Sequence, residues 1–252
     1  MPTGEMHLVF RLSGPAIRIF DDTSPDAGLQ LGHAVVNGPR ARFYAKDVSQ
    51  VSETIGIQLL PGAAQALLGM PADELAGQHV RLEDIWGSGA GLMREQLLAA
   101  PSPGGKLRCF EELLHQRLRA TETPAAHPMV ALALQQLRAG SSVEEAVIQS
   151  GYSHRQFIRL FSQAVGLAPK LYGRVQRFQQ ALGLMQRSDP ARLPGLAEVA
   201  MGAGYSDQPH FNREFREFRE FSGLPPEQYR AAQPVSHNHV PVPAQAANRS
   251  RR

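Results

Sequence analysis

Residues 151–172 read GYSHRQFIRLFSQAVGLAPKLY, and residues 204–229 read GYSDQPHFNREFREFREFSGLPPEQY. Both stretches open with Gly-Tyr-Ser, continue with phenylalanines at helical spacing, and close with a glycine, a proline and a tyrosine. A short apolar stretch of helical period precedes each of them, at 143–149 and at 196–201. Two short helices joined by a glycine turn, written twice, predict a pair of helix-turn-helix units.

Capping residues predict where these helices begin. Ser142 and Ser153 are each followed three residues later by Glu or Gln, which is the pattern of a capping box. In the second unit Ser206 is the predicted N-cap, and Asp207 suits the positive start of the helix. Gly151 stands in the turn between the first two helices, where a residue tolerant of positive φ is needed.

The second helix of each unit has an apolar face and a polar face. Phe157 and Phe161 define the apolar face in the first unit, and Phe211 and Phe215 define it in the second. The opposite faces carry Arg, Asn, Gln and His, which are side chains that read base edges in the major groove. Such residues also cover ordinary solvated helices. Their occurrence in a duplicated turn favours nucleic-acid recognition.

Residues 129–231 resemble the DNA-binding domain of AraC/XylS-family transcription regulators. The resemblance rests on the doubled helix-turn-helix, the Gly-Tyr-Ser turns, the G-x-x-P after each unit and the F-x-x-x-F stripe of the second unit. It implies a seven-helix domain whose two recognition helices enter successive major grooves on one side of double-stranded DNA, about 34 Å apart. It leaves open RNA polymerase, a small-molecule effector and a second copy of the chain as further partners.

The resemblance and the charge pattern give two sets of candidate DNA contacts. Carried over by position, the base contacts are Arg155, Ile158 and Arg159 in the first unit and Gln208, His210, Asn212 and Arg213 in the second. The candidate phosphate contacts are Arg138, Lys170, Arg174, Arg177 and Arg216. Residues 128–234 carry 12 Lys and Arg against 9 Asp and Glu, whereas residues 1–127 carry 11 against 14. The basic excess therefore lies with the repeat.

The second unit departs from the family pattern after Arg213. Arg-Glu-Phe is written three times in succession at 213–221, so the closing glycine comes three residues later than in the first unit. Three residues rotate a helix by about 300° and lengthen it by about 4.5 Å. We expect base reading to survive, because the extra triplet follows Arg213. We expect stability to suffer, because Gly223, Pro226 and Tyr229 are rotated from their usual packing positions.

Length and composition indicate a soluble globular protein. The chain has 252 residues, enough for two domains that each bury a core, with 42% hydrophobic and 19% charged residues. No stretch approaches the ~18 apolar residues of a membrane-spanning helix, and the N-terminus lacks the pattern of a signal peptide. The single cysteine, Cys109, excludes an intramolecular disulfide and fits a reducing compartment. A cytoplasmic location is expected.

The first half of the chain changes from strand-like to helical periodicity. Strands are predicted at 6–12, 16–20, 32–37, 41–45 and 54–60, and helices at 63–68, 72–75, 91–99 and 106–119. The fold class is therefore α+β, with a small N-terminal β-sandwich or barrel followed by helices, and a C-terminal all-α domain with two helix-turn-helix units. The expected divisions are a sensory or dimerisation domain at 1–120, a linker at 121–128, the DNA-binding domain at 129–232 and a disordered tail at 233–252.

The function of the first half is less sharply indicated. Residues 59–77 and 82–92 resemble the sensory-type domain of unknown function that precedes this DNA-binding domain in some family members. Aromatic residues that could line an effector pocket, but more often form a core, are Phe10, Phe20, Phe43, Tyr44 and Trp86. An apolar stripe on 106–119, together with Leu92, Met93, Leu97 and Leu98, fits either a dimer interface or packing within the domain.

The sequence gives little support for enzymatic chemistry. No Ser-His-Asp set, carboxylate pair or phosphate-binding glycine loop stands out, and no cofactor is expected. The histidines of the first half are scattered singly, and His237 and His239 lie on a Pro-rich tail, so no metal site is expected. Two alternatives stay open: a DNA-repair-type enzyme that borrows this DNA-binding domain and uses Cys109, and an interaction protein that has lost DNA binding. Cys109 has no neighbouring Cys or His to activate it, so a buried small hydrophobe is the simpler interpretation.

Overall fold

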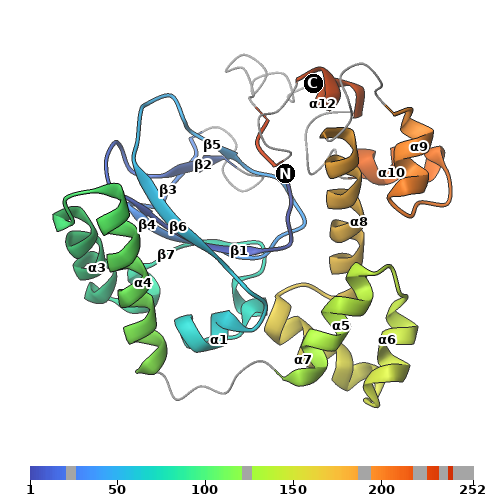
Figure 1. The fold of residues 1–252 in the computed structure, drawn as a ribbon, viewed down its shortest axis with the longest axis horizontal. Helices are drawn as coiled ribbons and strands as arrows, with labels where there is room; N and C mark the ends of the chain where they lie inside the picture. The colour runs from blue at the N-terminus through green and yellow to red at the C-terminus, as the bar shows by residue number, and fades with distance from the viewer. Residues whose placement is uncertain (21–26, 121–126, 187–193, 218–225, 233–237, 241–252) are drawn as a thin grey trace.

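The computed structural model describes residues 1–20, 27–120, 127–186, 194–217, 226–232 and 238–240. Its first part contains two antiparallel sheets followed by helices, and its second part is helical (Figure 1). This arrangement confirms the predicted α+β class. Residues 121–126 of the predicted linker, and most of the predicted tail, lie outside the described residues.

The larger sheet has four strands in the order β6-β1-β4-β7. Their bounds are β1 Met6–Arg11, β4 Ala34–Asn37, β6 Thr54–Leu59 and β7 His79–Arg81. The central strand β1 pairs antiparallel with β4, where Leu8 lies opposite Val36, and with β6, where Leu8 lies opposite Ile57. Because successive side chains of a strand point to opposite faces, Leu8 and Phe10 share one face, where both are fully buried.

Helices cover that apolar face. They are α1 Ala63–Leu68, the 3-10 helix η1 Ala72–Leu75, α2 Glu83–Trp86, α3 Ser88–Ala99 and α4 Pro103–Arg119. Phe10 packs edge-on against Phe110 of α4, with ring centroids 5.8 Å apart. The guanidinium of Arg117 lies 3.8 Å from the ring centroid of the buried Trp86. The core of the N-terminal part therefore lies between the sheet and these helices.

A smaller sheet, in the order β3-β2-β5, packs on the other face of the first. Its strands are β2 Arg18–Phe20, β3 Leu29–Gln30 and β5 Ala45–Lys46. The sequence does not predict β3 or β7, because two or three residues are too few to show a period. The predicted strand at 41–45 is wrong except at Ala45. Ala41 is buried instead in the core of the C-terminal helices, which the pattern of its own neighbours cannot show.

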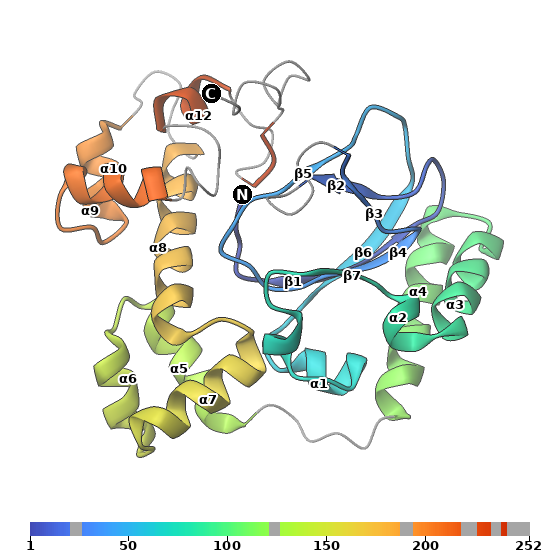
Figure 2. The ribbon, with the colours of Figure 1, turned by 180° about the vertical axis from the view of Figure 1, so that it is seen from behind.

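The second part contains seven described helices (Figure 2). They are α5 Pro128–Arg138, α6 Val143–Ser150, α7 His154–Val165, α8 Pro169–Gln186, α9 Leu196–Gly202, α10 Gln208–Glu217 and α12 Pro226–Ala231. Helix α8 runs between the two units, and its buried residues, including Tyr172 and Phe178, belong to the single core that both units share.

The caps agree with the sequence in the first unit and differ in the second. The capping box of Ser142 with Glu145 is complete, and Ser153 accepts a hydrogen bond from the N–H of Gln156. The prediction of Ser206 as N-cap is wrong by one residue. Asp207 Oδ1 accepts from the N–H of His210 at 2.6 Å, because a carboxylate is the stronger acceptor at a positive helix start.

The repeated Arg-Glu-Phe segment leaves the closing tyrosine of the second unit in the core. Phe211 and Phe215 are fully buried, and α10 extends to Glu217. Phe218 and Phe221 lie outside the described residues. Tyr229 of α12 is only 1% exposed, and its ring centroid lies 6.4 Å from that of Phe215. The extra triplet therefore does not keep Tyr229 from packing against the second unit.

Candidate nucleic-acid interface

The first recognition helix, α7, presents a polar face to solvent. Its apolar residues Phe157, Phe161 and Val165 are buried. Arg155 and Arg159 are exposed on the opposite side, and Arg159 makes one weak contact along the helix, 3.4 Å to Gln163 Oε1. Ile158, by contrast, is half-buried and packs partly against the core. The two arginines are thus free to donate to a partner, whereas Ile158 offers only part of its surface.

The second recognition helix, α10, presents a more constrained set. Arg213 is exposed, and Gln208, His210 and Asn212 are half-buried. The imidazole of His210 lies edge-on to Tyr205, with centroids 5.4 Å apart, and its Nδ1 lies 3.0 Å from Ser206 Oγ. These contacts fix the ring orientation. Asn212 Oδ1 is buried and has no hydrogen-bond partner in the described part of the chain.

Helix α8 holds α10 through an ion pair. Arg174 Nε lies 2.8 Å from Glu214 Oε1, and Glu214 is nearly buried on the inner side of α10. On the next turn of α8, the guanidinium of Arg177 lies 5.4 Å from the ring centroid of Tyr205. Burial, with Glu214 nearby, raises the pKa of Tyr205, so its hydroxyl stays protonated. These contacts set the position of the second recognition helix relative to the spacer.

The structure separates the five candidate phosphate contacts. Lys170 is exposed at the start of α8. Arg174 and Arg177 make the contacts with α10 and Tyr205 just described, and Arg138 donates from Nε to the hydroxyl of Tyr172 at 3.0 Å. The side chain of Arg216 lies outside the described part of the structure. Contact of these residues with phosphate stays a prediction.

Nothing in the sequence relates Arg174 to Glu214, and the structure brings the two residues together. Glu214 follows Phe211 by three residues and therefore shares the inner face of α10. A carboxylate on an apolar face needs a cation, and that is a signal that the sequence contains. The spacing between α8 and α10 is long, so the sequence alone does not say which arginine supplies the charge.

Cys109 and His79 of the first half pack against neighbouring protein groups. Cys109 is half-buried on α4 and packs against the N-terminal core. His79 is buried, with Nδ1 2.7 Å from Asn37 Oδ1 and its Nε2 against the guanidinium of Arg40. Within the described ranges, no three His, Cys, Asp or Glu side chains are placed to hold a metal ion. No helix among all the residues that the structure describes is both long and apolar enough to cross a membrane.

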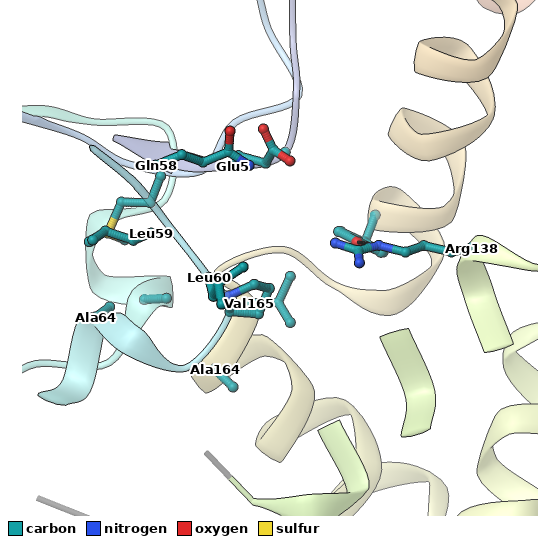
Figure 3. A pocket seen from close by; sticks show the side chains of 13 residues that line it. Glu5, Gln58, Leu59, Leu60, Ala64, Arg138, Ala164 and Val165 are labelled. Atoms are coloured by element: carbon teal, nitrogen blue, oxygen red, sulfur yellow. Dashed lines mark hydrogen bonds between the residues drawn. The ribbon is translucent and has the colours of Figure 1, made fainter. Parts of the chain in front are cut away.

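A cleft lies where the N-terminal part meets the first helix-turn-helix unit (Figure 3). It encloses about 430 Å³, part of it open to solvent, between β1, the turn before α1, and helices α5, α7 and α8. Its polar lining residues include Glu5, Gln58, Arg138 and Tyr172. None of the five aromatic residues considered from sequence lines this cleft: Phe10 and Trp86 belong to the N-terminal core instead.

Comparison with known proteins finds that the two parts of the chain match different family models. Residues 148–232 match the family described as a helix-turn-helix domain, and residues 1–81 match a domain of unknown function, DUF6597. Residues 148–232 form an AraC-type helix-turn-helix domain. This confirms the resemblance seen in the sequence. The AraC-type domain contains both recognition helices and the spacer between them.

Individual relatives are regulators of transcription by name. The chain is 29% identical over 141 residues to the HTH-type transcriptional regulator GbdR of Pseudomonas aeruginosa, in two strains, which covers 54% of this chain and 36% of GbdR. The chain thus spans about a third of the length of these curated relatives.

Two solved structures are weakly similar. A transcriptional regulator with an AraC-type DNA-binding domain from Chromobacterium violaceum matches at 25% identity and a TM-score of 0.36, over 42% of this chain and 92% of that one. ToxT from Vibrio cholerae matches at 8% identity and a TM-score of 0.44, over 92% of this chain and 91% of that one.

Proposed function

We propose that this protein is a sequence-specific DNA-binding transcription regulator that acts in the cytoplasm. The observation that carries the proposal is the pair of duplicated units on one spacer helix, each with a buried phenylalanine stripe and a polar outer face. Residues 129–232 are the proposed DNA-binding domain and residues 1–120 the proposed sensory or dimerisation domain, joined by 121–128. We propose no catalytic role for Cys109, whose surroundings are those of a core residue.

In this proposal the two recognition helices bind successive major grooves of double-stranded DNA. Arg155 and Arg159 are the best placed base contacts of the first unit, and Arg213 is that of the second, because all three are exposed. The other proposed base contacts are half-buried and offer only part of their surface to DNA; they are Ile158, Gln208, His210 and Asn212. Arginine donates two hydrogen bonds to guanine, and each such pair is worth about 1–3 kcal/mol of discrimination.

Helix α8 fixes the separation of the two units, so a site is read as two half-sites rather than one. Lys170 is the proposed phosphate contact with the freest side chain. Among the other candidates, Arg174, Arg177 and Arg216 would supplement it where their charge reaches the duplex, whereas Arg138 is held by the hydroxyl of Tyr172. Such contacts position the protein and make its affinity depend on salt.

The N-terminal part is proposed to pass a signal to the AraC-type domain. A small-molecule effector, RNA polymerase and a second copy of the chain are the proposed partners. Met93 and Leu97 are buried within the N-terminal part, whereas Leu92, Leu98 and Leu107 are exposed on α3 and α4. The exposed residues are therefore the ones available to a second copy.

The test is selection of bound fragments from a genomic DNA pool, over a series of salt concentrations. Wild type is compared with Arg155→Ala, Arg213→Ala and the control Arg108→Ala, an exposed arginine on α4. We expect one enriched motif spanning about two helical turns, which each recognition-helix variant relaxes in a different half and the control leaves intact. Equal, weak, salt-sensitive binding by all four proteins would overturn the proposal.

A further inference from the structure

The N-terminal part and the first helix-turn-helix unit touch along a seam with one tight side. The N–H of Gly62 donates to the carbonyl of Ala164, near the end of α7, at 2.8 Å. A Cβ added to Gly166 would lie 2.1 Å from Pro39 Cγ and 2.8 Å from the carbonyl oxygen of Ala72. No side chain larger than hydrogen fits there without movement. The first recognition helix therefore ends directly against the N-terminal part.

The other side of the seam is the polar cleft. Figure 3 shows the carboxylate of Glu5 and the guanidinium of Arg138 directed toward each other across it. Both residues lie in the described part of the chain, and the structure records no ion pair between them within 4.0 Å. Arg138 is instead held by the hydroxyl of Tyr172. Glu5 is thus a half-buried carboxylate, and the cation that faces it, Arg138, lies too far away to form an ion pair.

A half-buried charge without close compensation disfavours the conformation that buries it. We propose that the seam is a joint whose docking depends on two charges. The buried charge of Glu5 disfavours docking of the N-terminal part on the AraC-type domain, and the charge of Arg138 offsets part of that cost. Docking of the two parts is then a balance that a modest change in free energy can shift. A partner that neutralises or solvates the Glu5 carboxylate would shift this balance toward the docked position of the first recognition helix.

Two features support this assignment beyond the geometry. Burial raises the pKa of Glu5, and the opposing effects of the Arg138 charge and of a hydrogen bond from Gln58 are smaller. The same cleft also has apolar walls from both parts, including Leu59 and Val165, which keep water from fully solvating the carboxylate. The joint thus combines a fixed contact at Gly166 with an adjustable one at Glu5.

Removal of the Glu5 charge and removal of the Arg138 charge should have opposite effects on opening of the seam. Hydrogen exchange of the Gly62 amide, in the full chain without DNA, reports opening of the seam. We expect Glu5→Gln to slow this exchange and Arg138→Gln to speed it, each by roughly two- to fivefold. The double variant should behave like Glu5→Gln, because without the Glu5 carboxylate the charge of Arg138 has nothing to compensate in the cleft.

Three controls keep the test specific. Tyr172→Phe removes the hydroxyl that Arg138 contacts but keeps both charges. Lys170→Gln removes an exposed cation at the start of α8, outside the cleft lining. Exchange of core amides on β1 shows that each variant is folded. Changes of the same sign for Glu5→Gln and Arg138→Gln, or none for either, would overturn the proposal. Since no DNA is present, the result does not depend on the proposed DNA binding.

Discussion

Arg174 on the spacer helix and Glu214 on the second recognition helix form an ion pair, with Nε 2.8 Å from Oε1. Glu214 is 6% exposed, so its charge is removed from water and compensated inside the protein. The pair joins α8 to α10 on the side of α10 away from Arg213. It thereby couples the rigid spacer to the helix that is proposed to read DNA.

Loss of the arginine of this pair should be costly. Arg174→Met leaves Glu214 buried without its cation, and we expect the free energy of unfolding to fall by about 2–4 kcal/mol, as measured by urea denaturation. Arg213→Met on the exposed face of α10 is the matched control and should change stability little. Equal losses in both variants would show that Glu214 does not depend on Arg174.

Gly166 should resist substitution more strongly than Gly151. Both glycines have positive φ, +84° and +71°, so alanine strains the backbone similarly at each. Only Gly166 has neighbours within 4 Å of an added Cβ. We expect Gly166→Ala to destabilise the protein by about 1–3 kcal/mol more than Gly151→Ala in denaturant unfolding. A larger loss for Gly151→Ala would contradict the close contact at the seam.

Glu5 should make stability depend on pH in a definite direction. Burial raises its pKa above the ordinary 4.5, so the folded state holds the proton more tightly than the unfolded state. Its contribution to stability is therefore present below the ordinary pKa and is lost as pH rises through the raised pKa. Glu5→Gln removes this titration, so in urea denaturation we expect the variant to become more stable than the wild type as pH rises from below the ordinary pKa of Glu5 through its raised pKa. Glu95→Gln, an exposed glutamate on α3, should show no such gain.

Lys170 and Arg138 should differ in their effect on salt-dependent DNA binding. Removing one phosphate contact lowers the slope of log affinity against log salt by about 1. We expect this for Lys170→Ala, whose side chain is exposed, and not for Arg138→Ala, whose side chain faces Glu5 and Tyr172. Fluorescence anisotropy with one selected duplex measures both slopes. A reduced slope for Arg138→Ala alone would reverse the assignment.

The third Arg-Glu-Phe copy is expected to lower stability. Residues 219–221 lie outside the described part of the structure, and Tyr229 beyond them still reaches the core. The extra triplet lengthens the stretch of sequence between α10 and α12, and a longer connection costs more conformational entropy on folding. Deletion of 219–221 should therefore raise the melting temperature by about 2–4 °C. Calorimetry of the full chain measures the change. An unchanged or lower melting temperature would refute the expected cost.

The sequence by itself determined the repeat and the elements within it. The doubled Gly-Tyr-Ser turns, the phenylalanine stripes and the Ser142 cap all act within a few residues, so local spacing was enough to predict α6, α7, α9 and α10. The change from strand-like to helical period likewise predicted the α+β class. Arg155 and Arg213 were predicted outward and are exposed.

Only the tertiary structure decided which charges are free. Arg138, Arg174 and Lys170 are equivalent in sequence as cations of one basic region, yet they face Tyr172, Glu214 and solvent respectively. These contacts join residues 34 and 40 positions apart, or two separate parts of the chain, as at the Glu5 cleft. Local periodicity carries no information at such separations, because the packing of whole helices determines which side chains meet.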